Sequence, residues 1–354
     1  MRYVLFLVLS FFGCLSSSFA TSSCTPGGIC MSLHDQSNPW DTIDPNHAVL
    51  HGSVHVYLIF YGEWNYDGTL AGYTDPRINL LQNFIGDLNG SSWIAPVASY
   101  YDAAGAAATN LYFAGAIFDG AGNGTPTPGS QGNTLNNTTI INVLKRALTT
   151  TSDVRMDYSH TQLPTEDNAI YVIVGHHEVV ANLEGETYGG SSATHCGVHY
   201  NSKYFDTTSA NASYSSSWTL INNTNVKFIY VADPDTSSSL CEFFYSAGQP
   251  TPNGDKGGDA LTNILAHELV ESITDPVFYS VDDQNNYPYP TLEFGGWQDN
   301  TNQAEIADYC MQLPYPNTHY INNNTNNAPY TLNVGSHYYF LQGIYQAVGG
   351  PCIY

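Results

Sequence analysis

Apolar strand-like segments alternate with helix-like segments over most of this chain. Segments 53–61, 169–174 and 226–232 are rich in β-branched and aromatic residues and carry few charges, which is typical of strands buried on both faces of a sheet. Their alternation with helical segments predicts an α+β (α/β-like) fold, in which a mixed sheet is flanked by helices. Further strands are expected at 110–118, near 197–200 and at 337–345.

Three segments show the apolar spacing of amphipathic helices. The first follows Asp75-Pro76, the second spans 138–148, and the third is expected to run from Asp259, as its N-terminal cap, to Thr274. Asp275-Pro276 ends the third helix because a residue before proline avoids the helical conformation. The chain has no internal repeat and no long linker, so we expect a single domain.

The first residues have the pattern of a secretory signal peptide. Arg2 precedes an apolar run from Val4 to Leu15, and small residues lead to Ala20. This run is short for a membrane helix, and no later segment has about 20 consecutive apolar residues, so we expect no membrane span. The prediction is a signal peptide at 1–20 and a secreted domain at 21–354, located in the extracellular space or a cell wall. Within the secreted domain, 21–50 is expected to be an N-terminal extension and the core to span about 51–354.

Cysteine count and compartment together predict disulfide bonds. Cleavage would remove Cys14 from the 7 cysteines and leave an even number in an oxidising compartment, which predicts three disulfides that staple the fold. The sequence leaves the pairing open, and we favour neighbours along the chain. The cysteines are Cys24, Cys30, Cys196, Cys241, Cys310 and Cys352.

The chain is strongly acidic, with 8 Lys and Arg residues against 31 Asp and Glu residues and a formal net charge of −23. It has little with which to neutralise phosphates, which excludes nucleic acids and anionic membranes as electrostatic partners. The acidity suits an extracellular protein or one that attracts divalent cations. Only 11% of residues are charged, and glycans would add hydration. Acceptor sequons predict a glycoprotein and begin at Asn89, Asn123, Asn136, Asn137, Asn211, Asn222 and Asn323.

The third expected helix carries the residues with the most informative chemistry. His267 and Glu271 are four residues apart, so an imidazole and a carboxylate lie one turn apart, within reach of one divalent ion. Glu268 occupies the position of the general base in His-Glu-x-x-His zinc hydrolases, although Glu271 replaces the second histidine here. We therefore expect His267 and Glu271 to bind a metal and Glu268 to be catalytic. These charges lie beside the apolar face of the helix, where burial without a partner would be costly.

A further metal ligand is expected from the segment 304–310. Glu305 and Asp308 lie close to Cys310, and a disulfide there would hold either carboxylate in place. Zn²⁺ is the cofactor we expect, and Ca²⁺ is the alternative because it prefers hard oxygen donors. Such donors are present at Glu268, Glu271, Asp275 and Asp308, whereas His267 argues against calcium. The interpretation without a metal is an exposed helix whose charges are solvated.

Two functions are compatible with such a site. The first is a metal-dependent hydrolase that acts on a peptide substrate. One histidine and two carboxylates would neutralise Zn²⁺, however, and a neutral centre lowers the pKa of bound water less than a site with three histidines does. The second is therefore a non-catalytic protein bound to a cell-wall or extracellular-matrix polymer, in which the ion is structural. The sequence lacks a Gly-x-Ser-x-Gly motif, so serine-hydrolase chemistry has no local support.

Several short motifs carry a resemblance to a known family. They are Pro252-Asn-Gly-Asp-Lys-Gly-Gly-Asp259, Ala266-His-Glu-Leu-Val-Glu271, Thr274-Asp-Pro276, Tyr61-Gly-Glu-Trp64, Cys196-Gly-Val-His199 and 305–310. Together they resemble the EXORDIUM (phosphate-induced protein) family from about residue 50 to the C-terminus, and the His-Glu-x-x-Glu helix is similar to that of a microbial branch. The resemblance implies a secreted protein, associated in plants with the cell wall and with growth by cell expansion. A helix bearing His-Glu after the main strands is also similar to zincin-like folds.

Two further histidine motifs are weaker candidates. His176-His177-Glu178 follows an expected strand, and strand ends often carry site residues, yet an exposed pair of loop histidines is the simpler interpretation. His199 lies three residues after Cys196. We expect it to be a packed structural histidine, with an orientation toward the third helix as the alternative.

Overall fold

The computed structural model describes most of the chain from residue 48 onward, together with two short segments before it. The expected signal peptide, 1–20, lies outside the described residues. The described residues are 22–24, 30–33, 48–64, 75–120, 129–149, 155–156, 162–202, 220–234, 241–242, 250–281, 291–294, 296–299, 304–311, 318–320, 328–347, 350 and 352–354.

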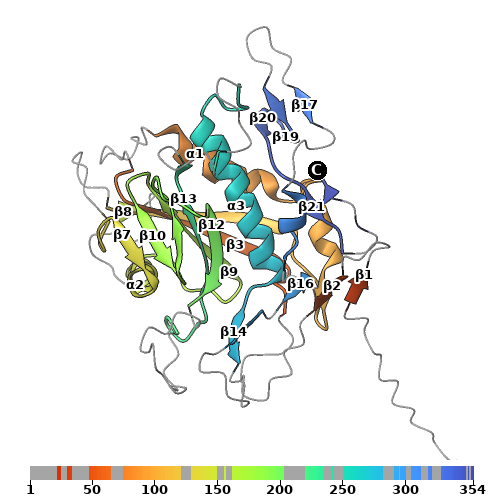
Figure 1. The fold of residues 1–354 in the computed structure, drawn as a ribbon, viewed down its shortest axis with the longest axis horizontal. Coiled ribbons are helices and arrows are strands. Elements are labelled where there is room, and N and C mark those ends of the chain that lie inside the picture. The colour runs from red at the N-terminus through yellow and green to blue at the C-terminus, as the bar shows by residue number, and fades with distance from the viewer. Residues whose placement is uncertain are drawn as a thin grey trace, which may run out of the picture.

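A six-stranded sheet lies at the centre of the molecule (Figure 1), with the strand order β12-β13-β9-β3-β6-β8. Its four inner strands are parallel and its two edge strands run antiparallel to their neighbours. The mixed sheet predicted from the sequence is therefore confirmed. The inner strands are β3 (Ser53–Tyr61), β6 (Asn110–Asp119), β9 (Ala169–Gly175) and β13 (Lys227–Ala232), and the edge strands are β8 (Arg155–Met156) and β12 (Gly197–Asn201).

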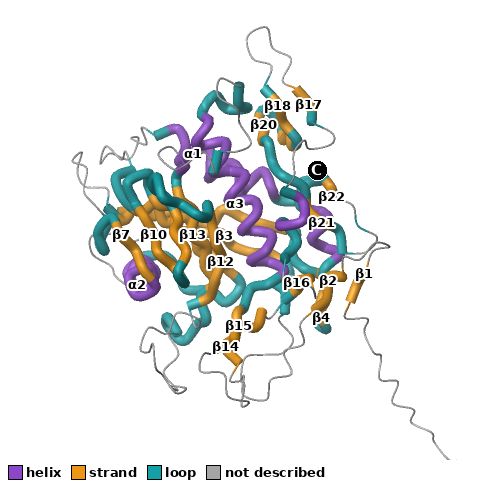
Figure 2. Tube along the Cα trace, in the orientation of Figure 1, coloured by secondary structure: helices purple, strands orange, loops and turns teal. Residues whose placement is uncertain are grey.

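Helices cover both faces of this sheet (Figure 2), which explains why its inner strands are so apolar. All seven residues of β9 are buried. Along β3, residues 56, 58 and 60 face one hydrophobic core and residues 57, 59 and 61 face another. Helices α1 (Pro76–Leu88) and α3 (Lys256–Thr274) contribute to the first core, and α2 (Asn137–Thr149) contributes to the second. The predicted α+β class is confirmed.

The start of α3 corrects one prediction from the sequence. Asp255, not Asp259, is the N-terminal cap, and its Oδ1 accepts a hydrogen bond from the Gly258 backbone N–H at 3.0 Å. Asp259 lies inside the first turn and is fully buried, where one carboxylate oxygen accepts from the Asn253 N–H at 3.0 Å. The cap therefore lies four residues before the expected one, because Gly257 and Gly258 are helical despite their weak intrinsic preference.

The strand expected at 337–345 is two strands, β20 (His337–Tyr339) and β21 (Ile344–Tyr345). The chain between them leaves the strand conformation where the Gln342 N–H donates to Asn263 Oδ1 of α3 at 2.6 Å. The remaining short elements are β4 (Tyr101–Asp102), β5 (Gly105–Ala106), β7 (Thr134–Asn136), β10 (Val180–Leu183), β11 (Glu186–Tyr188), β14 (Phe278–Val281), β15 (Thr291–Phe294), β17 (His319–Tyr320), β18 (Pro329–Tyr330), β19 (Leu332–Val334), β22 (Cys352–Ile353), η1 (Ala95–Ser99) and η3 (Asp308–Cys310).

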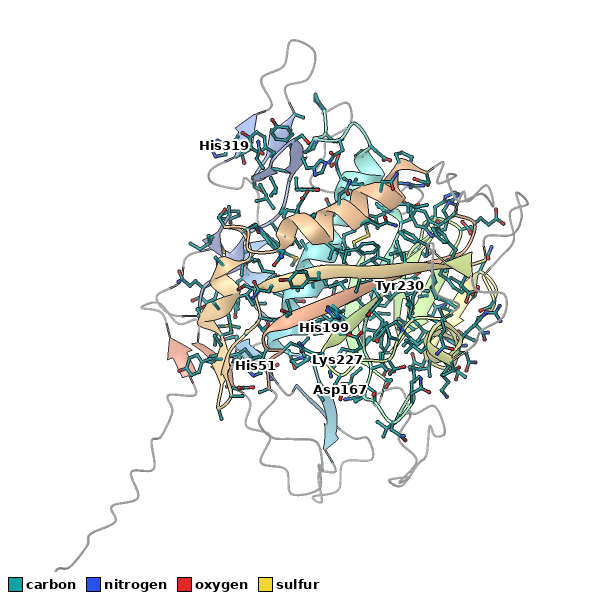
Figure 3. All side chains as sticks on the ribbon, turned by 180° about the vertical axis from the view of Figure 1, so that it is seen from behind. His51, Asp167, His199, Lys227, Tyr230 and His319 are labelled. Atoms are coloured by element: carbon teal, nitrogen blue, oxygen red, sulfur yellow. A yellow bond between two sulfur atoms is a disulfide. The ribbon has the colours of Figure 1, made fainter. Side chains whose placement is uncertain are left out.

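The segment expected as an N-terminal extension pairs with a distant part of the chain. Strand β1 (Ser22–Cys24) pairs with β2 (Cys30–Leu33), and β2 pairs with β16 (Trp297–Asp299). Met31 is fully buried in the same hydrophobic core as α1 and α3. By contrast with the buried Met31, His319 lies in the small β17–β18 hairpin, which projects away from the central sheet (Figure 3).

Two of the expected disulfides are confirmed, Cys196–Cys241 and Cys310–Cys352, and both join neighbours in the cysteine order. Cys24 and Cys30 face each other in the register of β1 and β2, but their side chains lie outside the described part of the chain. Among the described helices, none has the length and apolar character that a membrane crossing requires.

Candidate metal centre

Three segments that are far apart in the sequence meet in space: β12, α3 and 304–311. Strand β12 packs directly against the helix because residue 197 is glycine. A Cβ atom at Gly197 would lie 2.8 Å from Ile264 Cγ2 and 2.9 Å from Glu268 Cγ, so a larger residue would push the strand and the helix apart. The close approach brings His199 of β12 toward the polar residues of α3. The third segment, 304–311, contributes Glu305 and Asp308.

The side chains of these segments form one cluster of ionisable groups. His267 Nε2 lies 3.0 Å from Glu271 Oε2 and 3.7 Å from Asp308 Oδ1. His199 Nε2 lies 3.2 Å from Glu305 Oε2 and 3.9 Å from Glu271 Oε2. The structure thus brings the expected residues of α3 together with both downstream carboxylates. Asp308 reaches His267, whereas Glu305 reaches His199.

Donor atoms in this cluster fall into two overlapping groups that are compact enough to hold an ion. His199, Glu268 and Glu271 form one group, and His267, Glu271 and Asp308 form the other. Within each group, one donor atom per residue lies within 4.8 Å of the others. Glu271 belongs to both groups and is therefore the central carboxylate of the cluster.

The cluster is buried, which contradicts the interpretation of α3 as an exposed helix with solvated charges. Glu271 is 3% exposed, Glu268 6% and Glu305 8%. One carboxylate oxygen of Glu271 and one of Glu305 are buried without a hydrogen-bond partner among the described residues. Burying such oxygens unpaired is costly. A divalent cation bound between them would supply the missing interaction.

Gln342 orients the His267 ring. Its side-chain Nε2 donates to Ala307 O at 2.8 Å, so its Oε1 is the atom that faces His267. His267 Nδ1 lies 3.3 Å from that oxygen and donates to it, which directs Nε2 toward Glu271 and Asp308. Metal-binding histidines commonly use their second ring nitrogen in this way. No local motif surrounds Gln342, so the sequence alone does not indicate it as a site residue.

Segment 304–311 is held in place by its own hydrogen bonds and by a disulfide. Asp308 Oδ2 accepts from the Glu305 backbone N–H at 2.9 Å, which fixes the Asp308 carboxylate against the backbone of Glu305. The Tyr345 N–H donates to Ile306 O at 3.0 Å. Cys310, at the end of η3, is bonded to Cys352. The disulfide expected to anchor this segment is present.

The model of one protein family, described as the phosphate-induced protein 1 conserved region, matches residues 45–353. The chain belongs to the phosphate-induced protein 1 family. This match covers the resemblance that the sequence motifs indicated, and it includes every residue of the buried cluster beside α3. No curated protein and no solved structure matches the chain.

Burial and mutual repulsion shift the pKa values in the cluster of this family member. Burial raises the pKa of Glu268 to about 8, opposed by His267 and reinforced by Glu271. Burial, then Glu271 and Asp308, raises the pKa of Glu305 well above its usual range. Burial alone would lower the pKa of His267, but the neighbouring carboxylates, Glu271 first, hold it well above the usual value. Without a metal the cluster therefore retains protons that a divalent ion would displace.

In the metal-free protein, stability is expected to fall as the pH rises toward 8 and beyond. Glu268 has a pKa of 4.5 as a free side chain and about 8 in the folded protein, so the folded state binds more protons over this range. By linkage, the stability that Glu268 contributes is fully present below the first value and is lost as the pH rises through the second. The raised pKa values of His267, Glu305 and Asp308 act in the same direction.

Thermal melts in the presence of a chelator, between about pH 6.5 and about pH 8.5, check this expectation. Added Zn²⁺ is expected to reverse the slope, because ligand deprotonation favours metal binding. Glu268→Gln should flatten the pH dependence in chelator. A melting temperature that rises with pH in the chelated wild type would contradict the assigned shifts.

Asp275 and the His176-His177 pair lie outside this cluster, whereas His199 lies within it. Asp275, one of the oxygen donors considered for calcium, caps the C-terminus of α3 and is buried outside both donor groups. The expectation of an exposed His176-His177 pair is wrong for His176, which is 7% exposed. Burial, with repulsion from His177 and Arg77, lowers the pKa of His176 to about 4. His199 is buried, as a packed histidine would be, but it faces the carboxylates of α3 and Glu305.

Proposed function

We propose that this protein is a secreted zinc metalloprotein of zincin-like type and a metal-dependent hydrolase of peptide-like substrates. The observation that carries the proposal is the buried cluster of two imidazoles and four carboxylates, in which Glu271 and Glu305 each keep one buried oxygen without a partner among the described residues. A divalent cation accounts for both oxygens at once. It also compensates the excess of carboxylates over imidazoles.

The donor chemistry favours zinc over calcium. Calcium binds through oxygen ligands alone in most proteins, whereas this cluster offers the imidazoles of His199 and His267. Zinc combines imidazole and carboxylate ligands readily. In the proposed site, His199, His267 and Glu271 hold the ion together with Asp308 or Glu305.

Glu268 is the proposed general base. A bound divalent ion would supply Lewis-acid polarisation of a substrate carbonyl and would lower the pKa of Glu268, so that this carboxylate is able to accept a proton from water at neutral pH. The side chain of Asp308 is 37% exposed and that of His267 is 15% exposed. The cluster therefore reaches solvent on one side, where a substrate has access.

Secretion is part of the proposal. Disulfides form and persist in oxidising compartments, and this chain has two in the described residues. Asn89, Asn136 and Asn222, which begin acceptor sequons, are exposed, as glycosylation requires. The pattern of residues 1–20 adds to this support. We propose a single extracellular domain from a microbial branch of the family.

A second candidate is a non-catalytic cell-wall or matrix protein in which the zinc is structural. The specific observation in its favour is the number of carboxylates. With Glu271, Glu305 and Asp308 around one ion, the centre would carry a net negative charge and polarise a carbonyl weakly. Its partner would be a cell-wall or extracellular-matrix polymer.

Metal analysis and Glu268→Gln test the two functions in turn. Protein purified without chelator is expected to contain at least one equivalent of zinc, since a buried site retains its ion. Less than about a tenth of an equivalent would refute both forms of the proposal.

On a peptide library, Glu268→Gln should lower hydrolysis by about 100-fold or more while metal content and melting temperature are kept. Glu186→Gln, in an exposed side chain, is the matched control. Hydrolysis by the wild type that Glu268→Gln leaves unchanged would exclude Glu268 as the base, and absence of hydrolysis favours the structural ion.

A further inference from the structure

A second group of metal-binding side chains lies at the carboxyl edge of the parallel strands. Strands β9 and β13 are parallel neighbours, and Gly175 pairs with Ala232 where they end. The next residue of each strand, His176 and Asp233, therefore emerges at the same edge. Backbone hydrogen bonds fix both, from the Asp233 N–H to Gly175 O and from the His176 N–H to Tyr61 O, each at 2.9 Å. This edge is where ligands of open α/β sheets commonly bind.

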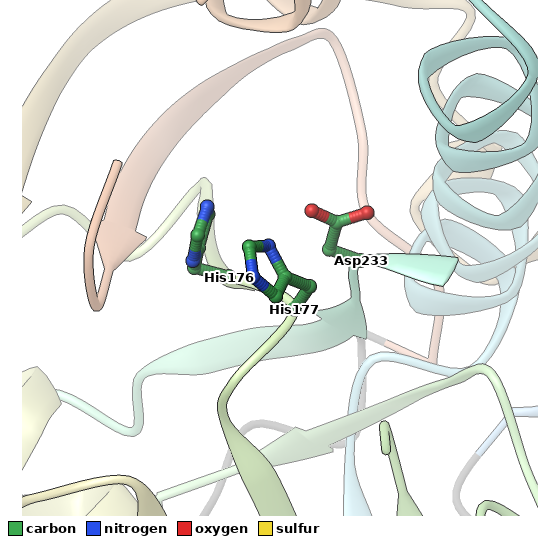
Figure 4. A group of neighbouring side chains, drawn as sticks. All are labelled: His176, His177 and Asp233. Carbon is green, nitrogen blue, oxygen red and sulfur yellow. The ribbon is translucent and has the colours of Figure 1, made fainter. Parts of the chain in front are cut away.

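We propose that His176, His177 and Asp233 form a second transition-metal site. One donor atom of each residue lies within 4.8 Å of the others, and Figure 4 shows the two imidazoles beside the Asp233 carboxylate. Two imidazoles and one carboxylate are a ligand set used for Zn²⁺ and for non-haem Fe²⁺. His176 and Asp233 are buried and His177 is half-buried, so the site is shielded but reachable from one side.

The surroundings of His176 are those of a positioned ligand. Its Nδ1 is hydrogen-bonded to Glu178 Oε2, and the other oxygen of Glu178 accepts from the Glu63 N–H at 2.7 Å. The ring also packs edge-on against Trp64, with centroids 5.2 Å apart. A carboxylate on one ring nitrogen orients the imidazole and raises its basicity as a ligand. His176 would therefore bind the ion through Nε2.

Asp233 is held by Arg77. Arg77 Nη1 donates to Asp233 Oδ2 at 2.7 Å, and its Nε and Nη2 both donate to Asp75. The guanidinium is thus neutralised by Asp75 while it fixes the Asp233 carboxylate. Asp255 Oδ2 also lies 4.0 Å from Arg77 Nε, so three carboxylates face one guanidinium, and this excess of negative charge favours a bound cation.

This site is separate from the proposed zinc centre at α3. His199 pairs with Ile229 of β13, which is four residues before Asp233. At about 3.3 Å per residue, the two sites lie roughly 13 Å apart along the strand, which is too far for one ion to use ligands from both. They should therefore bind metal independently.

Equilibrium dialysis against Zn²⁺ alone, with metal content measured by mass spectrometry, tests the proposal. Wild-type protein should hold an ion at each site, His177→Asn should lose one equivalent, and Glu271→Gln should lose the other. His195→Asn is the matched control, because this histidine is 51% exposed in its side chain and pairs with Glu186. His177 is half-buried, so its variant is expected to fold, and circular dichroism checks this.

The outcomes separate this site from the α3 centre. Zinc that is retained in Glu271→Gln and lost in His177→Asn supports the second site, even if the α3 centre proves to bind none. Equal zinc in wild type and His177→Asn overturns it. A measurement without any variant is protection of His176 and His177 from diethyl pyrocarbonate by Zn²⁺, mapped by mass spectrometry. Absence of that protection overturns the site as well.

Discussion

Glu271→Gln is expected to lower the affinity of the α3 centre for zinc by more than about 100-fold without lowering the stability of the metal-free protein. Glu271 belongs to both donor groups of the cluster, and its Oε2 lies 3.0 Å from His267 Nε2. Residues that merely orient a metal ligand contribute about 10- to 100-fold to affinity. Loss of a carboxylate that would itself bind the proposed ion, from the centre of the cluster, should cost more.

The stability of the metal-free variant separates a metal ligand from a simple ion pair. If the role of Glu271 were to pair with His267, its loss would strand a buried imidazolium and cost about 3–5 kcal/mol. In this cluster, however, Glu268 and Asp308 also face His267. Glutamine keeps the size of the side chain and an oxygen that accepts from His267. It also removes a charge that repels Glu305, so we expect no net loss.

Competition for Zn²⁺ against a chromophoric chelator, with thermal melts in chelator, measures both quantities. Glu166→Gln is the matched control, since Glu166 also pairs with a histidine, His55, at 2.6 Å but lies outside the cluster. It should leave zinc affinity unchanged. A zinc affinity for Glu271→Gln within about threefold of wild type would show that Glu271 is not a ligand.

The sheet and the three helices were predictable because their determinants are local. Strand β3 has the predicted bounds, and α1 begins at Asp75-Pro76 as predicted, with Asp75 as a cap whose side chain accepts from the Arg77 N–H. The apolar residues predicted at helical spacing in α1 are all buried, namely Ile78, Leu81, Phe84, Ile85 and Leu88. The start of α3 was misplaced because Asp255 and Asp259 are both suitable caps, and the glycines between them favoured the later one.

The candidate site was predictable only where its residues share an element. His267, Glu268 and Glu271 lie on one helix, so their spacing fixes their proximity. His199 is in the cluster because β12 pairs with β13 beneath α3, and this contact joins parts of the chain that are distant in sequence. The local indication of this close approach is Gly197, two residues before His199. A Cβ atom at position 197 would lie 2.9 Å from Glu268 Cγ.

The polar face of α3 was expected to be solvated in the absence of a metal. Helical periodicity predicts which residues share a face but does not tell what covers that face. Here β12 and segment 304–311 cover it, so Glu268 and Glu271 are buried. The sequence pattern therefore identified candidate ligands, whereas the tertiary structure provides the argument that they need a cation.

Removal of the Cys310–Cys352 disulfide, by Cys310→Ser with Cys352→Ser, is expected to destabilise the protein and to lower zinc affinity together. The two cysteines are 42 residues apart, and closing a loop of this length constrains the unfolded chain by about 4 kcal/mol in the chain-entropy model. Zinc affinity should fall about tenfold or more, because the disulfide anchors η3, which begins with Asp308. Denaturant unfolding and chelator competition measure the two effects.

The Cys196–Cys241 disulfide provides a matched comparison, because its separation of 45 residues predicts nearly the same loss of stability. Its effect on zinc should be small. His199 lies in β12, which pairs with β13 over five residue pairs and so keeps its place without the disulfide. Segment 304–311 has no such strand pairing in its described residues and depends on a few hydrogen bonds, such as the one from Tyr345 N–H to Ile306 O. Equal losses of zinc affinity in the two double variants would mean that Asp308 and Glu305 owe their positions to global stability. A loss confined to Cys310→Ser with Cys352→Ser would show that the Cys310–Cys352 disulfide places them.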